Sequence, residues 1–580
     1  MILMSILYIT VAIPLSSITL VRWNRIGAVF LLFTLLFLVE STHLNISSFS
    51  SNYSADGYSL FNGLILNNQI TTSMDFLVIV AGLALIYPST RPIFSEASNV
   101  DTNSKMNSSS QILFYLCTLL GSIIIIGSGD LFILLLGIEL QSYSLYIIAS
   151  SKRDKATALN EPAEAAGLKY YLLGALASAL ILLGIGLLYS VMGTTNIYSL
   201  SILIQSCYSV SYENSIWDPN FVCSGLGLLF ILIGLIWKFA GAPLHNWAID
   251  VYDAVPTITA DWLAVIPKIA LLTITSEIMV SFANQSYVLD YSLNAHQLLL
   301  TNWKGLTSLD ILNQYAGVQA SLLILIVSAL SMVIGAIGAL TQPLIKRLLA
   351  YSSVSQIGFI LLAVGVQAED SALFYLIQYT LTNTALWLCL ISASLFNRNE
   401  EESIVSAGSY LNNYQTKDIR TIKELQGLHI NNVFLSIAFA LLFFSLAGIP
   451  PMIGFFAKFE VIASSLNKGF IGLSLIAITA SLISATYYIR VIRQIWFTKN
   501  MEVFKPFNSF NARLSLTTDS NTSKLPLLAA HSNSNTTNNV SVLMPSTIAL
   551  FISILVLGST LFICQGSVVL TLCRLFILFG

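Results

Sequence analysis

The stretch GLIWKFAGAPLHNWAIDVYDAVPTITADWLAVIPK, from Gly234 to Lys268, decides how the rest of the chain is read. It is an apolar helix pattern that Gly and Pro interrupt, with Lys238 before the interruption and Lys268 after it. A Lys inside a lipid-spanning helix costs at least ~2.5 kcal/mol, so both side chains are expected to face protein or water rather than acyl chains. Two such lysines beside a broken helix predict an ion pathway.

The composition of the whole chain is that of a protein embedded in a membrane. Of its 580 residues, 56% are hydrophobic and 9% are charged, and the mean hydropathy is +0.79, whereas soluble domains carry about 25% charged residues. A span needs about 20 apolar residues, so the apolar runs predict an all-α polytopic membrane protein with about 14 transmembrane helices. The net charge of −2 excludes a strongly basic surface, so we expect no nucleic acid partner.

The distribution of basic residues predicts the orientation of the chain. Most of the 26 Lys and Arg residues fall in the loops that follow odd-numbered predicted helices, including Lys152, Arg153, Lys346 and Arg347. The positive-inside rule assigns these loops to the cytoplasm or matrix, and both termini to the opposite side. The start MILMSILYIT lacks the Arg-rich character of a transit peptide and is expected to remain as a span.

A second interruption by Gly and Pro indicates an internal repeat. The segment from Lys238 to Pro243 aligns with the segment from Ser445 to Pro450, each on the fourth helix of a block of five. Paired broken helices are typical of inverted-repeat transporters, and an odd number of helices per block requires the second block to be inverted. The predicted helix breaks are Gly241, Pro243, Gly448 and Pro450.

These patterns divide the chain into six segments. We expect peripheral helices 1 to 3 in residues 1–110, a first five-helix repeat in 111–282, a polar loop in 283–316, an inverted second repeat in 317–497, an Asn/Ser-rich matrix-side loop in 498–542, and helix 14 with the C-terminus in 543–580. The low-complexity composition of 498–542 is the reason for assigning it to a loop.

Other ionisable residues inside predicted spans extend the pathway. Glu139 lies about nine residues, or ~13 Å of helix rise, inside its span, and Lys458 follows the second break. Intramembrane charges indicate function by default, although a structural polar pair with Ser142 or Ser144 is the alternative for Glu139. The predicted proton relay, joined by water chains, consists of Glu139, Lys238, Lys268 and Lys458.

Two further residues are possible accessory members of the relay. Lys169 lies roughly one turn inside its predicted helix, where a Lys can also extend to the membrane interface. His245 lies at the first break, where it can relay protons or simply hydrogen-bond to the interrupted backbone. The six cysteines are scattered without Cys-x-x-Cys spacing, so we expect no metal, iron–sulfur or haem site.

At these residues the chain resembles the antiporter-like subunits of respiratory complex I and, among them, the subunit 2 group of NADH:ubiquinone oxidoreductase. The resemblance covers predicted helices 4 to 13. It is most specific in GAPLHNWAIDVYDAVPTITADWLAVIPK, and GIPPMIGFFAKF supports it. Ile249 stands where the family commonly has Pro, and Asp253-Ala254 stand where Glu-Gly is frequent. The residues that match the family's charged positions in helices 5, 7, 8 and 12 are Glu139, Lys238, Lys268 and Lys458.

The resemblance implies proton pumping coupled to quinone reduction elsewhere in the complex. It implies that NADH, FMN, the iron–sulfur clusters and ubiquinone belong to other subunits and that this chain binds no cofactor, with lipids left open as ligands. The implied partners are other membrane-arm subunits, especially neighbouring antiporter-like subunits, and membrane lipids. The helix number fits bacterial, fungal and plant forms of the family, and the Asn/Ser-rich insert and the lack of a transit-peptide pattern favour the inner membrane of a fungal mitochondrion, with both termini in the intermembrane space.

Two other functions fit some of the same features. A stand-alone or multisubunit cation/proton antiporter would share this fold. A purely structural membrane anchor would leave the buried charges unexplained.

Overall fold

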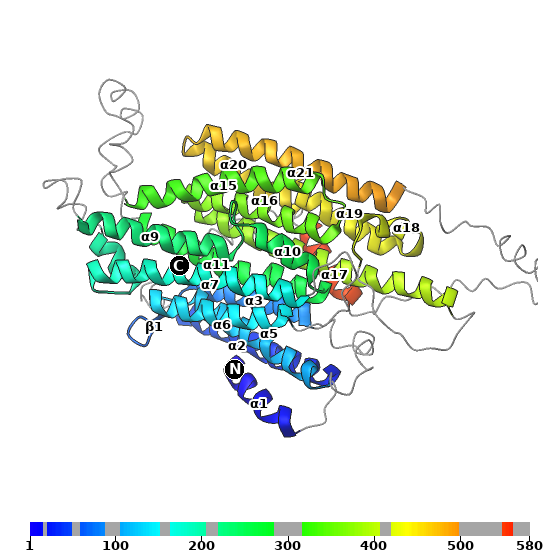
Figure 1. The fold of residues 1–580 in the computed structure, drawn as a ribbon, viewed down its shortest axis with the longest axis horizontal. Helices are drawn as coiled ribbons and strands as arrows, with labels where there is room; N and C mark the ends of the chain where they lie inside the picture. The colour runs from blue at the N-terminus through cyan, green and yellow to red at the C-terminus, as the bar shows by residue number, and fades with distance from the viewer. Residues whose placement is uncertain are drawn as a thin grey trace, which may run out of the picture.

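The computed structural model is a bundle of helices that lie side by side (Figure 1). The structure describes residues 1–15, 20–48, 58–86, 105–150, 163–204, 219–283, 316–405, 419–497 and 548–560. The loop predicted at 498–542 lies outside the described residues, and so does the loop predicted at 283–316 apart from its two end residues.

Helices dominate because backbone N–H and C=O groups in hydrocarbon must be paired within their own segment. The first half contains α1 (Ile2–Leu15), α2 (Leu20–Ser48), the hairpin β1 (Tyr58–Leu60) and β2 (Ile65–Asn67), α3 (Gln69–Ile86), α5 (Lys105–Ile126), α6 (Leu131–Ser150), α7 (Ala163–Met192), α9 (Pro219–Lys238), α10 (Asn246–Ala254) and α11 (Thr257–Ala283). The second half contains α15 (Ala316–Leu340), α16 (Ile345–Gly365), α17 (Glu369–Val405), the 3₁₀ turn η5 (Ile422–Leu425), α18 (Leu428–Asn431), α19 (Val433–Ala447), α20 (Ile453–Asn467) and α21 (Ile471–Phe497).

The lengths and composition of these helices confirm an all-α polytopic membrane protein. In the described part of the chain, nine helices are long and apolar enough to cross a membrane. Shorter apolar helices accompany them, among them Gln111–Ile126, Cys223–Lys238 and Val433–Ala447. The number of about 14 spans and the two-repeat organisation stay predictions.

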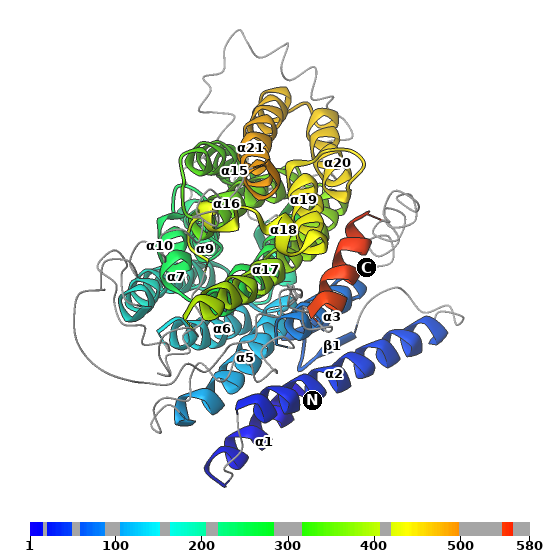
Figure 2. The same ribbon diagram turned by 90° about the vertical axis from the view of Figure 1, so that its right-hand side faces the viewer.

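The first helices lie at one edge of the bundle. Figure 2 shows α1 and α2 outside the main group, with α3 and α5 between them and the rest. Helix α3 also packs against α11 and α17, so it reaches further into the bundle than α1 and α2 do. The C-terminal described helix, Ile548–Thr560, lies near α3 in the same view.

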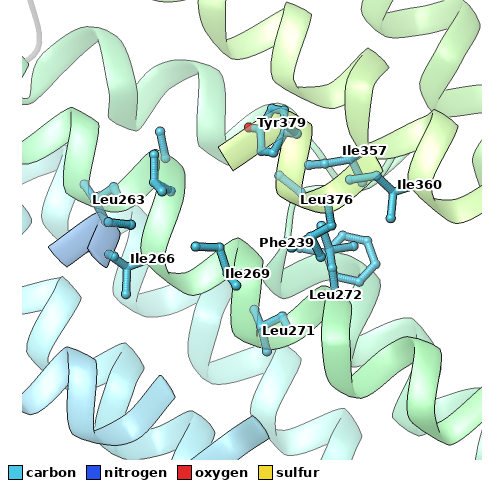
Figure 3. Packing of buried hydrophobic residues seen from close by; sticks show 14 of the residues in the cluster. Phe239, Leu263, Ile266, Ile269, Leu271, Leu272, Ile357, Ile360, Leu376 and Tyr379 are labelled. Atoms are coloured by element: carbon cyan, nitrogen blue, oxygen red, sulfur yellow. The ribbon is translucent and has the colours of Figure 1, made fainter. Parts of the chain in front are cut away.

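The centre of the bundle is formed by α11, α16 and α17. In the 18-residue apolar segment of α16, 94% of the residues are buried inside the chain, whereas 33% are buried in that of α7. The side chains that fill this centre include, in Figure 3, Leu263, Ile266, Ile269, Ile357, Ile360, Leu376 and Tyr379. A polar side chain on these three helices therefore faces protein rather than lipid.

Close contact between α15 and α16 depends on a small residue. A Cβ atom added at Gly335 would lie 2.6 Å from the backbone nitrogen of Ser355. Helix pairs in membranes commonly use such small residues to bring their backbones together, since burial from water contributes little between helices in lipid. The distance leaves no room for a side chain at this crossing.

We predict that Gly335→Val destabilises the protein by about 1–3 kcal/mol, because the added atoms overpack a contact with fixed backbone. The measurement is the thermal unfolding temperature of the purified protein, together with the amount of chain recovered from the membrane. Gly186→Val is the matched control, because Gly186 is also helical but a Cβ there would meet nothing within 4 Å. Equal losses in both variants would show that helix propensity, rather than packing, decides the effect.

Candidate functional site

The first broken helix supplies the setting of the site. Helix α9 ends at Lys238 and α10 begins at Asn246, with Gly241 and Pro243 between them. The last carbonyls of a helix have no partner within it. The indole nitrogen of Trp247 on α10 donates to one of them, the oxygen of Trp237, at 2.9 Å.

Lys238 points from the end of α9 toward α6. Its Nζ donates to Oγ of Ser142 at 3.3 Å. Glu139 lies one turn earlier on α6, and its charge acts on Lys238 electrostatically. Among the described residues, no direct ion pair joins the two, and Oε1 of Glu139 is buried without a hydrogen-bond partner.

The serines near Glu139 have other partners. Ser142 Oγ donates to the carbonyl of Ile138 at 2.7 Å, and Ser144 Oγ donates to that of Leu140 at 2.9 Å. These are local bonds within α6. Neither hydroxyl therefore forms the structural pair with the Glu139 carboxylate that the sequence left open.

Lys268 lies at the centre of the bundle, with 3% of its surface exposed. Its Nζ donates to Oγ of Ser353 on α16 at 2.9 Å. It also lies 5.3 Å from the centre of the Tyr252 ring on α10, a distance at which a cation and an aromatic face attract each other. Three elements thus enclose this ammonium group.

Lys458 is tied to the second break. Helix α19 ends at Ala447, and Gly448 adopts a left-handed conformation with φ of +83° that closes the helix. Nζ of Lys458 donates to the last carbonyls of α19, those of Leu446 at 2.9 Å and Ala447 at 3.0 Å. A Cβ at position 448 would lie 2.8 Å from Cδ of Lys458, so the glycine also makes room for the lysine.

Helix α16 connects Lys268 with Lys458. Ser353 and Gln356 are three residues apart and therefore share one face of α16. Ser353 accepts from Lys268, while Nε2 of Gln356 donates to the carbonyl of Leu446 at 3.3 Å. That carbonyl is also an acceptor for Lys458. A line of polar groups thus crosses from α11 to the second break.

The accessory candidates have different surroundings. Nζ of Lys169 lies 3.8 Å from a carboxylate oxygen of Asp250, and the two side chains are 41% and 47% exposed. This is a surface ion pair of the kind that contributes little energy. His245 is buried at the first break, where Nδ1 lies 3.2 Å from the carbonyl oxygen of Pro243. These partners differ from the groups that Lys238, Lys268 and Lys458 bind.

One buried lysine was assigned wrongly from the sequence. Lys346, which we counted with the loop cations, lies in the first turn of α16 and is buried. Its Nζ donates at 2.9 Å to the carbonyl of Val255, which caps α10. Arg347 beside it donates from Nε to Asp253 at 2.8 Å. Charge counting could not reveal this, because the acceptor comes from a helix end about ninety residues away.

The chemistry that this arrangement offers is proton transfer. Within the described ranges, no group of three His, Cys, Asp or Glu side chains could hold a metal ion. Lysine amines and a carboxylate can take up and release protons, hydroxyls can pass them on, and carbonyl oxygens accept hydrogen bonds from the protonated groups. None of these groups by itself supplies a redox centre.

Comparisons with known proteins identify the family. The family model described as NADH:quinone oxidoreductase/Mrp antiporter, transmembrane, matches residues 128–317 and 311–484. The chain is 35% identical to NADH-ubiquinone oxidoreductase chain 2 of Rhizopus oryzae over 86% of each protein. It is 30% identical to NADH-quinone oxidoreductase subunit N of Pelagibacter ubique, over 79% of this chain and 82% of that protein.

Solved structures agree on the fold. A chain of respiratory complex I from Thermus thermophilus matches with a TM-score of 0.64 at 20% identity, covering 98% of this chain and 99% of that one. A chain of the Mrp complex from Dietzia matches with a TM-score of 0.67 at 18% identity, covering 99% and 95%. The resemblance inferred from the helix breaks and their lysines is confirmed. The chain belongs to the membrane-subunit family that NADH:quinone oxidoreductases share with Mrp antiporters and, within it, to the chain 2 or subunit N members of complex I.

Proposed function

We propose that this chain translocates protons within the membrane arm of NADH:ubiquinone oxidoreductase, driven by quinone reduction in other subunits. The observation that supports this most is the character of the hydrogen-bond partners of the three lysines. Lys238 and Lys268 each donate to a serine hydroxyl, and Lys458 donates to two carbonyls. A lysine paired directly with a carboxylate would be held in its charged form, whereas neutral partners let it release a proton at lower cost.

The hydroxyl partners suit both protonation states of a lysine. A serine oxygen accepts from an ammonium group, and its O–H can rotate to donate to a neutral amine. Carbonyl oxygens only accept, and they carry the negative end of the α19 dipole. We therefore infer that Lys238 and Lys268 exchange protons readily, and that Lys458 favours its protonated form.

In this mechanism, the charge of Glu139 determines whether Lys238 holds or releases its proton. Its charge acts on Lys238 across the α6–α9 contact without a direct ion pair in the described residues. A nearby carboxylate stabilises the protonated lysine, so neutralising or moving Glu139 promotes release. The released proton passes toward Lys268 and then, along the polar face of α16, toward Lys458. The direction of net transfer follows from which side reloads Lys238.

The proposed function also implies a membrane and partner subunits for this chain. We infer that it lies in the inner membrane of a mitochondrion, with both termini in the intermembrane space, and contacts other membrane-arm subunits and lipids. We infer also that NADH, FMN, iron–sulfur clusters and ubiquinone bind elsewhere in the complex. The 35% identity to a fungal NADH-ubiquinone oxidoreductase chain supports this assignment.

A cation/proton antiporter is the second candidate, because the fold is shared with a chain of the Mrp complex. Purification from native membranes separates the two functions. Flavin and iron–sulfur proteins bound to the chain would support the first. Co-purification with antiporter subunits alone would exclude it.

We predict that Lys238→Ala or Lys268→Ala reduces quinone-coupled proton pumping by about tenfold or more, because a positioned proton-transfer group typically contributes ~10²–10⁴-fold. The measurement is proton uptake per electron in vesicles that contain the assembled complex. Lys423→Ala is the matched control, since it removes the same charge from an exposed side chain in η5 that has no place in the proposed relay. Normal pumping by an assembled Lys238→Ala variant would remove that residue from the relay.

We predict that Ser353→Ala slows pumping without loss of assembly, because Lys268 loses its hydroxyl partner. A hydrogen bond to a charged group contributes about 1.5–3 kcal/mol, so we expect roughly a tenfold effect. Ser328→Ala is the control, because Ser328 is equally buried and bonds to the carbonyl of Leu325 in its own helix. If both variants pump alike, Ser353 does not serve Lys268.

A further inference from the structure

Asp261 is a buried carboxyl group that the proposed relay does not use. It lies in the second turn of α11, with 1% of its surface exposed. Both of its carboxylate oxygens are buried, and neither has a hydrogen-bond partner among the described residues. Because it is enclosed by this chain, a partner subunit cannot reach it.

The surroundings of Asp261 are fixed by the contact between α11 and α5. The next residue, Trp262, packs its ring 4.5 Å from that of Tyr115 and donates from Nε1 to Thr118 at 2.8 Å. Tyr115 is thereby held against the residue that follows Asp261 in α11. No described basic side chain forms an ion pair with Asp261. The carboxyl group is thus enclosed without a compensating charge.

Burial of this kind determines the charge of the group. A bare carboxylate without a partner is far more costly inside a protein than a neutral acid of the same shape. Burial without a partner therefore favours the neutral, protonated form of Asp261. A buried group that holds a proton at membrane depth is a candidate carrier.

The position of Asp261 relates it to Lys268. The two residues are seven apart on α11, which places them within about 20° of the same face and ~10 Å apart along the axis. Between them, Pro267 lacks an N–H and so frees the carbonyl of Leu263. The hydroxyl of Tyr252 donates to that carbonyl at 3.3 Å, and its ring lies 5.3 Å from Nζ of Lys268. Along α11, a hydrogen-bonded hydroxyl and carbonyl thus lie between Asp261 and Lys268.

We propose that Asp261 is a proton-exchanging carboxyl that reloads Lys268 from the start of α11, an inference that rests on the proton relay proposed above. In the step, the O–H bond of Asp261 breaks and an N–H bond forms on the neutral Lys268 amine, with water molecules carrying the proton past Tyr252. Asp261 becomes a carboxylate and the lysine an ammonium ion. To complete the cycle, a proton from water on the N-terminal side of α11 binds the carboxylate and restores the O–H bond of Asp261.

The test is Asp261→Asn in the assembled complex, with Asp261→Glu as the variant that keeps a carboxyl. Asn has the shape and neutrality of the protonated acid, but its amide group does not release a proton at physiological pH. We expect Asp261→Asn to assemble, to pump several-fold fewer protons per electron, and to lose the infrared C=O band of a protonated carboxylic acid. Asp261→Glu keeps the band and most of the pumping.

Two outcomes overturn the inference. The first is normal pumping by Asp261→Asn, since a structural role alone would survive this change. The second is an unchanged carboxylic acid band in that variant. If Asp261→Asn does not assemble, Asp261→Leu takes its place, because Leu needs no hydrogen-bond partner. Normal pumping by Asp261→Leu would also overturn the inference.

Lys268→Ala, measured in parallel, separates this inference from the relay itself. If Lys268→Ala loses pumping and Asp261→Asn does not, only the role of Asp261 fails. If both pump normally, the relay fails as well.

Discussion

The structure depends on one constraint: in hydrocarbon, every polar group that a broken helix frees must find its partner inside the protein. At the second break, Lys458 occupies the carbonyls that end α19. At the first, the indole of Trp247 occupies the carbonyl of Trp237, and Lys346 occupies that of Val255 at the end of α10. The helix ends thus offer carbonyl acceptors to buried lysines. Lys346 and Lys458 in turn provide the donors that these carbonyls need.

The two breaks use lysine in different ways. Lys458 itself binds the helix end, so its charge contributes to the fold as well as to any proton path. Lys238 ends its helix but turns to a hydroxyl on α6, leaving Glu139 close enough to act on it without binding it. In the proposed relay, the first break is therefore the adjustable one, and the second supplies a more fixed positive charge.

Helix α16 is one of the helices that join the two halves of the described chain. It is enclosed almost completely and places Ser353 against Lys268 and Gln356 against the carbonyl shared with Lys458. Its sequence is mostly apolar with scattered hydroxyls, a pattern that also fits ordinary contacts between helices. Which of its polar residues face the lysines follows from packing against α11 and α20, and no local pattern encodes that.

The sequence by itself determined the membrane fold, both helix interruptions and the intramembrane charges, because length, hydropathy and Gly/Pro positions act locally on the backbone. It could not reveal that Lys346 is buried, that Lys169 is half exposed, or that the Asp261 carboxyl has no hydrogen-bond partner among the described residues. Those facts depend on which helices meet. Tertiary structure alone decided them, since the cost of a buried charge is set by the groups that surround it and not by its neighbours in the chain.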